Sequence, residues 1–163
     1  MQKVTIVQRV MTKYRDEFYH CLRPLLKEQD IELEFIHGLG HDKDRERGYL
    51  STISWAKVVE ESYWNLGFTR LVQQPYEKYL HDSDLVIIQQ EMSWLLNYRL
   101  ISNRLHNPFK LAFWGHGLNR QEDVSNFRNR WKRKWMNSVD WWFAYTSGVA
   151  QYLRENGFPA EQI

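Results

Sequence analysis

Residues 110–117 read Lys-Leu-Ala-Phe-Trp-Gly-His-Gly, an apolar run that ends in a histidine held between two glycines. The run Lys110 to Trp114 predicts a buried strand, because it is a short, continuous apolar stretch that ends at a glycine. The histidine and the Leu118-Asn119-Arg120 segment after it then follow the carboxyl end of that strand. In an open α/β sheet this edge forms the ligand crevice, so His116 is the first residue to consider for chemistry.

On either side of this stretch, strand and helix patterns alternate. Further strands are expected at Val4–Gln8, Ile31–Ile36, Asp84–Gln89 and Trp141–Tyr145. Helices are expected from Phe18 to Leu26, at Tyr76–Leu80, at Trp94–Leu105 and from Thr146-Ser147 to Gly157, with Pro24 expected to kink or shorten the first. This alternation predicts an α/β fold with a mostly parallel sheet, in one domain spanning residues 1–163.

Two segments fit this pattern less well. Residues 39–55 are charged and punctuated by glycine, so they are interpreted as a solvated loop, with His41 a part of it. Between Ile53 and Gln73, Val58-Val59 and Leu71-Val72 are interpreted as short strand pieces around a turn at Gly67.

Composition excludes several classes of protein. The single cysteine, Cys21, excludes an internal disulfide and a multi-cysteine zinc site, and its apolar neighbours predict a small core residue. The chain has neither a dinucleotide-binding glycine fingerprint nor a P-loop motif, and its six histidines are scattered, so no metal or cofactor is expected. It shows no signal-peptide pattern and no apolar stretch long enough to span a bilayer, which predicts a cytoplasmic protein.

Polar residues follow several of the expected strands and should meet at one edge of the sheet. His116 is interpreted as a hydrogen-bonding or base group, or as a histidine satisfied by backbone groups. The other candidates have equally plain alternatives: Glu91 as a helix cap, Tyr14 and Arg15 as solvated side chains. His37 and Thr146 are also expected at this edge, and Thr146 and Ser147 are interpreted first as caps. The expected catalytic residue is His116, and the expected substrate-binding residues are Tyr14, Arg15, Glu91, Gly115, Gly117, Asn119 and Ser147.

A basic segment, Arg128 to Lys134, carries five positive and no negative charges, although the whole chain has a net charge of only +2. On a helix, Val124, Phe127, Trp131 and Trp135 would form one stripe and Arg130, Arg133 and Lys134 would lie on the other side. Three interpretations remain open: a core-packed helix with a solvated basic side, an interfacial helix on anionic lipid, or a nucleic-acid contact. The residues concerned are Arg128, Arg130, Trp131, Lys132, Arg133, Lys134 and Trp135.

Three stretches together resemble a known family. They are the opening Val4-Thr5-Ile6-Val7-Gln8 with Tyr14 to Phe18, the Trp114-Gly115-His116-Gly117 turn, and the block Phe143 to Pro159. They are similar to the N-terminal domain of family 4 glycosyltransferases, which have the GT-B fold. The resemblance spans nearly the whole chain, and the last block is its most specific part. It implies a Rossmann-like sheet with helices on both faces, as the N-terminal half of a GT-B enzyme.

The resemblance also implies an activity. The enzyme would move a sugar, as a retaining hexosyltransferase without a metal, from a nucleotide sugar to a glycan, lipid-linked or small-molecule acceptor. This domain would bind the acceptor, His116 would lie near the donor sugar, and Tyr14-Arg15 would face the cleft. The nucleotide sugar and the family's paired glutamates belong to a second domain, expected beyond Ile163, so the chain alone should be inactive. A membrane surface is an expected partner, with the protein peripheral at its inner face; nucleic acid is not. The chain lacks the family's usual glycine-rich first loop. The alternative is a stand-alone binding module for anionic lipid or nucleic acid.

Overall fold

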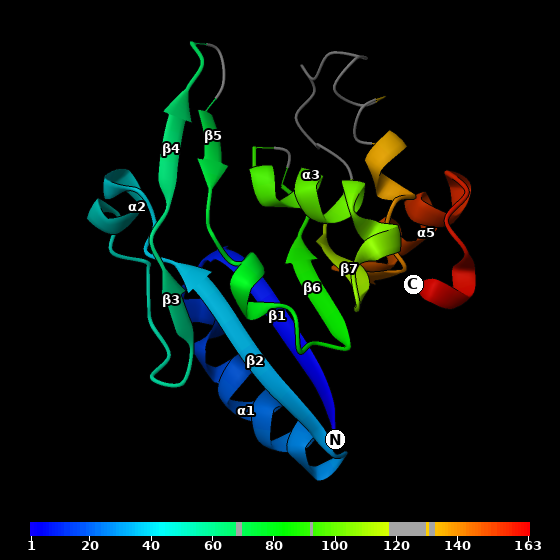
Figure 1. The fold of residues 1–163 in the computed structure, drawn as a ribbon, viewed down its shortest axis with the longest axis horizontal. Helices are drawn as coiled ribbons and strands as arrows, with labels where there is room; N and C mark the ends of the chain where they lie inside the picture. Colours follow the sequence, from blue (N-terminus) through cyan, green and yellow to red (C-terminus); the bar gives the residue numbers. More distant parts are fainter. Residues whose placement is uncertain (68–69, 92, 118–129, 131–132) are drawn as a thin grey trace.

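A parallel six-stranded sheet forms the centre of the computed structural model, which describes residues 1–67, 70–91, 93–117, 130 and 133–163 (Figure 1). All five strand pairings in this sheet are parallel. The spatial order is β3 (Lys57–Val59), β2 (Ile31–Gly38), β1 (Gln2–Val10), β6 (Leu85–Gln89), β7 (Lys110–Gly115) and β8 (Trp141–Ala144). The α/β, Rossmann-like class predicted from the sequence is confirmed.

The direction of strand addition reverses at β1. Strands β2 and β3 lie on one side of it, and β6, β7 and β8 follow on the other. The carboxyl ends of the strands point toward the top of Figure 1, where the chain runs into the loops that carry the candidate residues. Such a switch point opens a crevice between the loops that leave the two strands, here β1 and β6.

Helices cover both faces of the sheet, because successive side chains of each strand point to opposite faces. On β6, Val86 and Ile88 join a core cluster with Leu100 of α3 (Leu95–Ser102), whereas Ile87 joins a second cluster with Tyr19 of α1 (Asp16–Glu28). The helix α5 (Ser147–Glu155) packs on the α3 side through Val149 and Leu153. The sheet thus separates two cores, and the larger one lies under α3 and α5.

A small antiparallel hairpin, β4 (Ser62–Asn65) with β5 (Arg70–Gln73), rises beyond the carboxyl edge of the sheet (Figure 1). Gly67 lies in its connection with a φ of 71°, as the predicted turn requires. The predicted pieces Val58-Val59 and Leu71-Val72 fall in β3 and β5. Sequence reasoning missed β4, because a protruding strand with mostly exposed side chains lacks the apolar alternation that marks a half-buried one.

Short helical turns fill the remaining connections. A five-residue helix, α2 (Asp42–Glu46), interrupts the segment that was interpreted as an irregular loop. His41 is not merely solvated: its side chain accepts a hydrogen bond from the Lys43 backbone N–H at 3.3 Å and caps α2. The 3₁₀ turns are η1 (Lys13–Arg15), η2 (Glu77–Tyr79), η3 (Arg104–His106) and η4 (Ala160–Gln162).

Most of the remaining predictions are confirmed within a residue or two, and two are corrected. The helix expected at Trp94–Leu105 is α3 followed by η3, and Thr146 caps α5 by accepting from the Val149 backbone N–H. Cys21 is exposed, because α1 turns Tyr19 toward the sheet and Cys21 away from it. Pro24 does not shorten α1, which continues to Glu28.

Candidate functional site

Arg15 joins the ends of three strands at the carboxyl edge of the sheet. Its Nη1 donates to Oε1 of Gln8 on β1 at 2.7 Å, and its Nη2 donates to the Tyr145 hydroxyl, just after β8, at 2.8 Å. The guanidinium also lies 5.6 Å from the ring centre of Trp114 on β7 and 5.2 Å from that of Tyr14. We call Gln8, Arg15, Trp114, His116 and Tyr145 the rim cluster.

His116 belongs to this cluster through Tyr145. The imidazole is exposed directly after β7, and its ring centre lies 4.4 Å from that of Tyr145, with 34° between the planes. Gly115 permits the close packing of this turn, since a Cβ there would lie 2.9 Å from the Gln90 Cβ. Gly117 has a φ of 65°, a left-handed conformation that strains any other residue except asparagine or aspartate. The two glycines therefore hold the imidazole at the open edge of the sheet.

Tyr145 is a neutral phenol in this arrangement. Burial raises its pKa above the ordinary value, although the nearby Arg15 guanidinium acts in the opposite direction. Since the hydroxyl oxygen accepts from Arg15, its own O–H remains free to donate. The rim cluster thus combines a cation, a phenol donor and an imidazole with the half-buried rings of Trp114 and Tyr145, a set suited to hydrogen-bonding and stacking on a polar ring.

Glu91 lies beside this cluster but is held by an ion pair. Its Oε2 lies 3.4 Å from Nε of Arg9, and its Oε1 accepts from the Ser93 hydroxyl at 2.9 Å. Arg9 also binds Asp44 of α2, with Nη1 and Oδ2 3.0 Å apart. Burial lowers the pKa of Arg9, but the two carboxylates outweigh it and leave that pKa above its ordinary value. This network ties the end of β1 to the segments that follow β2 and β6 at the switch point.

The remaining predicted site residues differ in how they lie relative to the rim cluster. Tyr14 is mostly exposed on η1, next to the Arg15 guanidinium, and His37 is only 1% exposed at the end of β2, where it pairs with Gln8. Ser147 is exposed at the first turn of α5, where Thr146 is the cap. The structure therefore brings Arg15, His116 and Tyr14 to one edge, whereas His37 is buried next to Gln8 and Ser147 lies on α5 and lines the trough described next.

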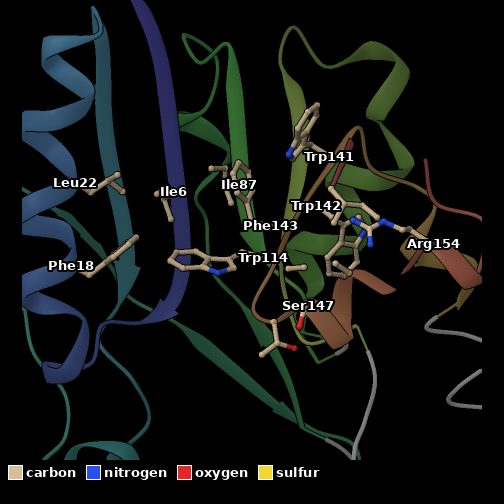
Figure 2. A pocket seen from close by; sticks show the side chains of 14 residues that line it. Ile6, Phe18, Leu22, Ile87, Trp114, Trp141, Trp142, Phe143, Ser147 and Arg154 are labelled. Atoms are coloured by element: carbon tan, nitrogen blue, oxygen red, sulfur yellow. The ribbon is translucent and has the colours of Figure 1, made fainter. Parts of the chain in front are cut away.

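An apolar trough of about 600 Å³ lies on the α1 face of the sheet (Figure 2). Phe18 and Leu22 of α1 form one wall, and Trp141 and Phe143 of β8 lie toward the other, where Ser147 and Arg154 are found. Trp114 lies between the two walls, and the guanidinium of Arg15 in the rim cluster lies over its ring. The trough therefore adjoins the site, and its lining suits apolar contact more than polar recognition.

The basic segment lies largely outside the described residues, as do Asn119, Arg128, Trp131 and Lys132. Of the part that is described, Arg130, Arg133 and Lys134 are exposed. Trp135 packs against the core on the α3 side, its ring centre 5.2 Å from that of Tyr98 in an edge-on arrangement. For Trp135 this matches the core-packed interpretation.

Within the described ranges, no group of three or more histidine, cysteine, aspartate or glutamate side chains is placed to hold a metal ion. In the same part of the chain, no helix is both long and apolar enough to cross a bilayer.

Sequence reasoning missed Arg9, Tyr145 and Asp44 as members of the site. Tyr145 was assigned to the strand that it follows, and Asp44 to a solvated loop. Position at the carboxyl end of an expected strand is a signal that could have found both, because Arg9 directly follows Val4–Gln8 and Tyr145 is the last residue of Trp141–Tyr145. Nothing in the sequence pairs Arg9 with Asp44, because the two approach each other only through the packing of α2.

No family model matches the chain, and no curated protein matches it in sequence. Among solved structures, it resembles HepE of Anabaena, whose crystal structure holds UDP and glucose, with a TM-score of 0.52 and 13% identity. The match covers 99% of this chain and 43% of HepE, so the chain spans less than half the length of that protein. At this identity the likeness establishes the shared Rossmann-like α/β fold alone.

Proposed function

We propose that this chain is the acceptor-binding domain of a glycosyltransferase that takes a sugar from a nucleotide-sugar donor. The observation that carries the proposal is the rim cluster, which places His116, Tyr145 and Arg15 together at the carboxyl edge of β1, β7 and β8. The family 4, GT-B resemblance assigns His116 a place near the donor sugar. The fold shared with HepE, a protein crystallised with UDP and glucose, supports the same reaction class.

In this proposal the rim cluster forms one wall of the reaction cleft. The exposed His116 imidazole contacts the transferred sugar, and the Tyr145 hydroxyl and Arg15 guanidinium bind hydroxyl or anionic groups of the bound substrates. The exposed ring of Tyr14 offers a stacking surface for a sugar ring. The donor nucleotide binds on the opposite wall, formed by a second domain, and no metal takes part.

The test uses the full-length protein that contains this chain, with UDP-glucose as the first donor. We expect His116→Ala to reduce sugar transfer by about 100-fold or more, the lower range for loss of a group acting directly in proton transfer or substrate contact. His106→Ala is the matched control, because His106 is equally exposed but precedes β7 at the opposite edge of the sheet. Equal transfer by the two variants would refute the role of His116.

The alternative is a binding module that uses the basic segment, in which Arg130 and Arg133 are exposed. Co-sedimentation with vesicles containing an anionic lipid, compared between the wild type and an Arg130→Glu/Arg133→Glu variant, tests it. Binding that the charge reversal abolishes supports this alternative. Salt-sensitive DNA binding without vesicle binding would favour its nucleic-acid form.

A further inference from the structure

His37 is a buried histidine with one ring nitrogen unused. It lies at the end of β2, with its imidazole 1% exposed and its ring centre 5.5 Å from that of Phe35. Nδ1 lies 2.8 Å from the Gly38 carbonyl oxygen. Within the residues that the structure describes, Nε2 has no hydrogen-bond partner, although it is shielded from solvent. Leaving such an atom unsatisfied is costly, so its surroundings indicate what it can bind.

The hydrogen bond of Nδ1 defines the protonation of the ring. A carbonyl oxygen only accepts, so Nδ1 must carry the proton and donate it. Burial lowers the pKa of His37 below its ordinary value, so the imidazole is neutral at physiological pH. Nε2 is then an acceptor with a free lone pair, and its partner must be a donor such as a hydroxyl or an amide N–H.

A separate cavity of about 360 Å³ lies against His37. Met11, Leu39 and Leu50 form apolar parts of its lining, and Ser51 and Thr52 contribute hydroxyl groups. Its volume lies within the range of small-molecule sites, roughly 300–1,000 Å³. Arg45 also lines it, but the guanidinium is already paired with Asp42 at the surface. The imidazole among the lining residues is therefore neutral.

This cavity adjoins the rim cluster without sharing its residues. His37 lies beside Gln8 in the parallel pairing of β1 and β2, and Gln8 accepts from Arg15. On the other side, the Ser51 hydroxyl donates to Oδ2 of Asp16, the residue after Arg15. A ligand held at His37 is thus separated from the rim cluster by the end of β1 and the η1 turn.

We propose that the cavity against His37 binds a neutral, hydroxyl-bearing ring of the sugar or cyclic-polyol class, with one ring hydroxyl donating to Nε2 of His37. The apolar lining contacts the ring carbons, as in other small-molecule sites with few polar anchors. The assignment of this ring to the glycosyl acceptor rests on the proposed function. The binding itself does not depend on it.

The test is a ¹⁵N NMR titration of the histidine side chains in the full-length protein, with D-glucose and myo-inositol as separate probes. We expect the ¹⁵N chemical shift of His37 Nε2 to move, saturably, toward the value of a nitrogen that accepts a hydrogen bond, while Nδ1 stays protonated throughout. Tetrahydropyran, which has the ring but no hydroxyl, should leave Nε2 unshifted. Removing one hydrogen bond of this kind should weaken binding about three- to tenfold.

Two variants and a control make the test specific. Thr52→Phe fills the cavity from its exposed rim and leaves His37 in place, so the shift at Nε2 should disappear. His37→Phe removes the acceptor together with its NMR signal, so its affinity is measured by isothermal titration calorimetry beside the wild type and should be weaker by the factor above. Ser54→Phe adds the same ring at an exposed neighbour that does not line the cavity, and binding should match the wild type.

The outcomes separate this inference from the proposed function. If neither probe shifts Nε2 up to its solubility limit, or if Thr52→Phe binds as well as the wild type, the inference is wrong even where sugar transfer depends on His116. If a probe binds at His37 but the full-length protein transfers no sugar, the inference holds and the proposed function fails.

Discussion

Replacing Gly38 with alanine should loosen the loop that follows β2. A Cβ at this position would lie 2.0 Å from Nε2 of Gln74 and 2.2 Å from Oε1 of Glu61, closer than real Cβ contacts come. Both contacting groups are ends of flexible side chains, so they can move, but each is already engaged. Glu61 accepts from the backbone N–H groups of Leu39 and Gly40 at 2.9 Å each, and Gln74 donates to the Arg9 carbonyl at 3.1 Å.

The magnitude follows from the bonds that the displacement breaks. A hydrogen bond to a charged group contributes about 1.5–3 kcal/mol and a neutral one about 1 kcal/mol. The bond to Leu39 is exposed, so water replaces much of it, and the bonds made by Gly40 and Gln74 dominate. We expect Gly38→Ala to lower the free energy of unfolding by about 2–4 kcal/mol.

The assay is urea unfolding followed by tryptophan fluorescence, with the slope against urea checked for constancy. Gly148→Ala is the matched control, because its Cβ would meet nothing closer than 3.8 Å on the exposed side of α5, and it should stabilise the protein by about 0.5–1 kcal/mol. In a Glu61→Ala background, the cost of Gly38→Ala should shrink by 1 kcal/mol or more, roughly the value of the lost bond. A cost below about 0.5 kcal/mol in the wild-type background, or an equal cost in both, would refute this reasoning.

Three further predictions concern single side chains. Because burial lowers the pKa of His37 in the folded protein, the unfolded chain binds a proton more readily below pH about 6.5, so the free energy of unfolding should fall as the pH drops through that value. In urea titrations at pH 7 and below, His37→Phe should make the free energy of unfolding depend less on pH. An unchanged pH dependence would contradict the prediction. Cys21 should react with a thiol reagent in the native protein without prior unfolding, because it is exposed, whereas protection until unfolding would show a buried residue. Arg15→Met should raise the pKa of Tyr145 further, since it removes the guanidinium that lowers it. This pKa can be measured by ¹³C NMR of the labelled tyrosine ring, and a fall in it would contradict the prediction.

The strands and the class of fold could be predicted because the information is local. A parallel strand buried on both faces must be a continuous apolar run, and Leu85–Gln89 and Lys110–Gly115 are such runs in this chain. Glycine and threonine marked the ends of α5 for equally local reasons, a left-handed φ at Gly157 and a hydrogen bond at Thr146. Cys21 was misplaced because helical spacing shows which residues share a face, but not which face meets the sheet.

The site depended on the tertiary structure to a greater degree. The sequence by itself determined that His116 lies in a glycine-flanked turn at a strand end, since that follows from residues adjacent in the chain. Only the order of the strands from β1 to β8 and the position of η1 at their carboxyl edge decided that Arg15 reaches Tyr145, 130 positions away. Only the burial of β2 left His37 with an unused nitrogen beside a cavity. The physical reason is that hydrogen bonds and burial depend on distances in space, which strand order and helix packing set and local sequence pattern does not.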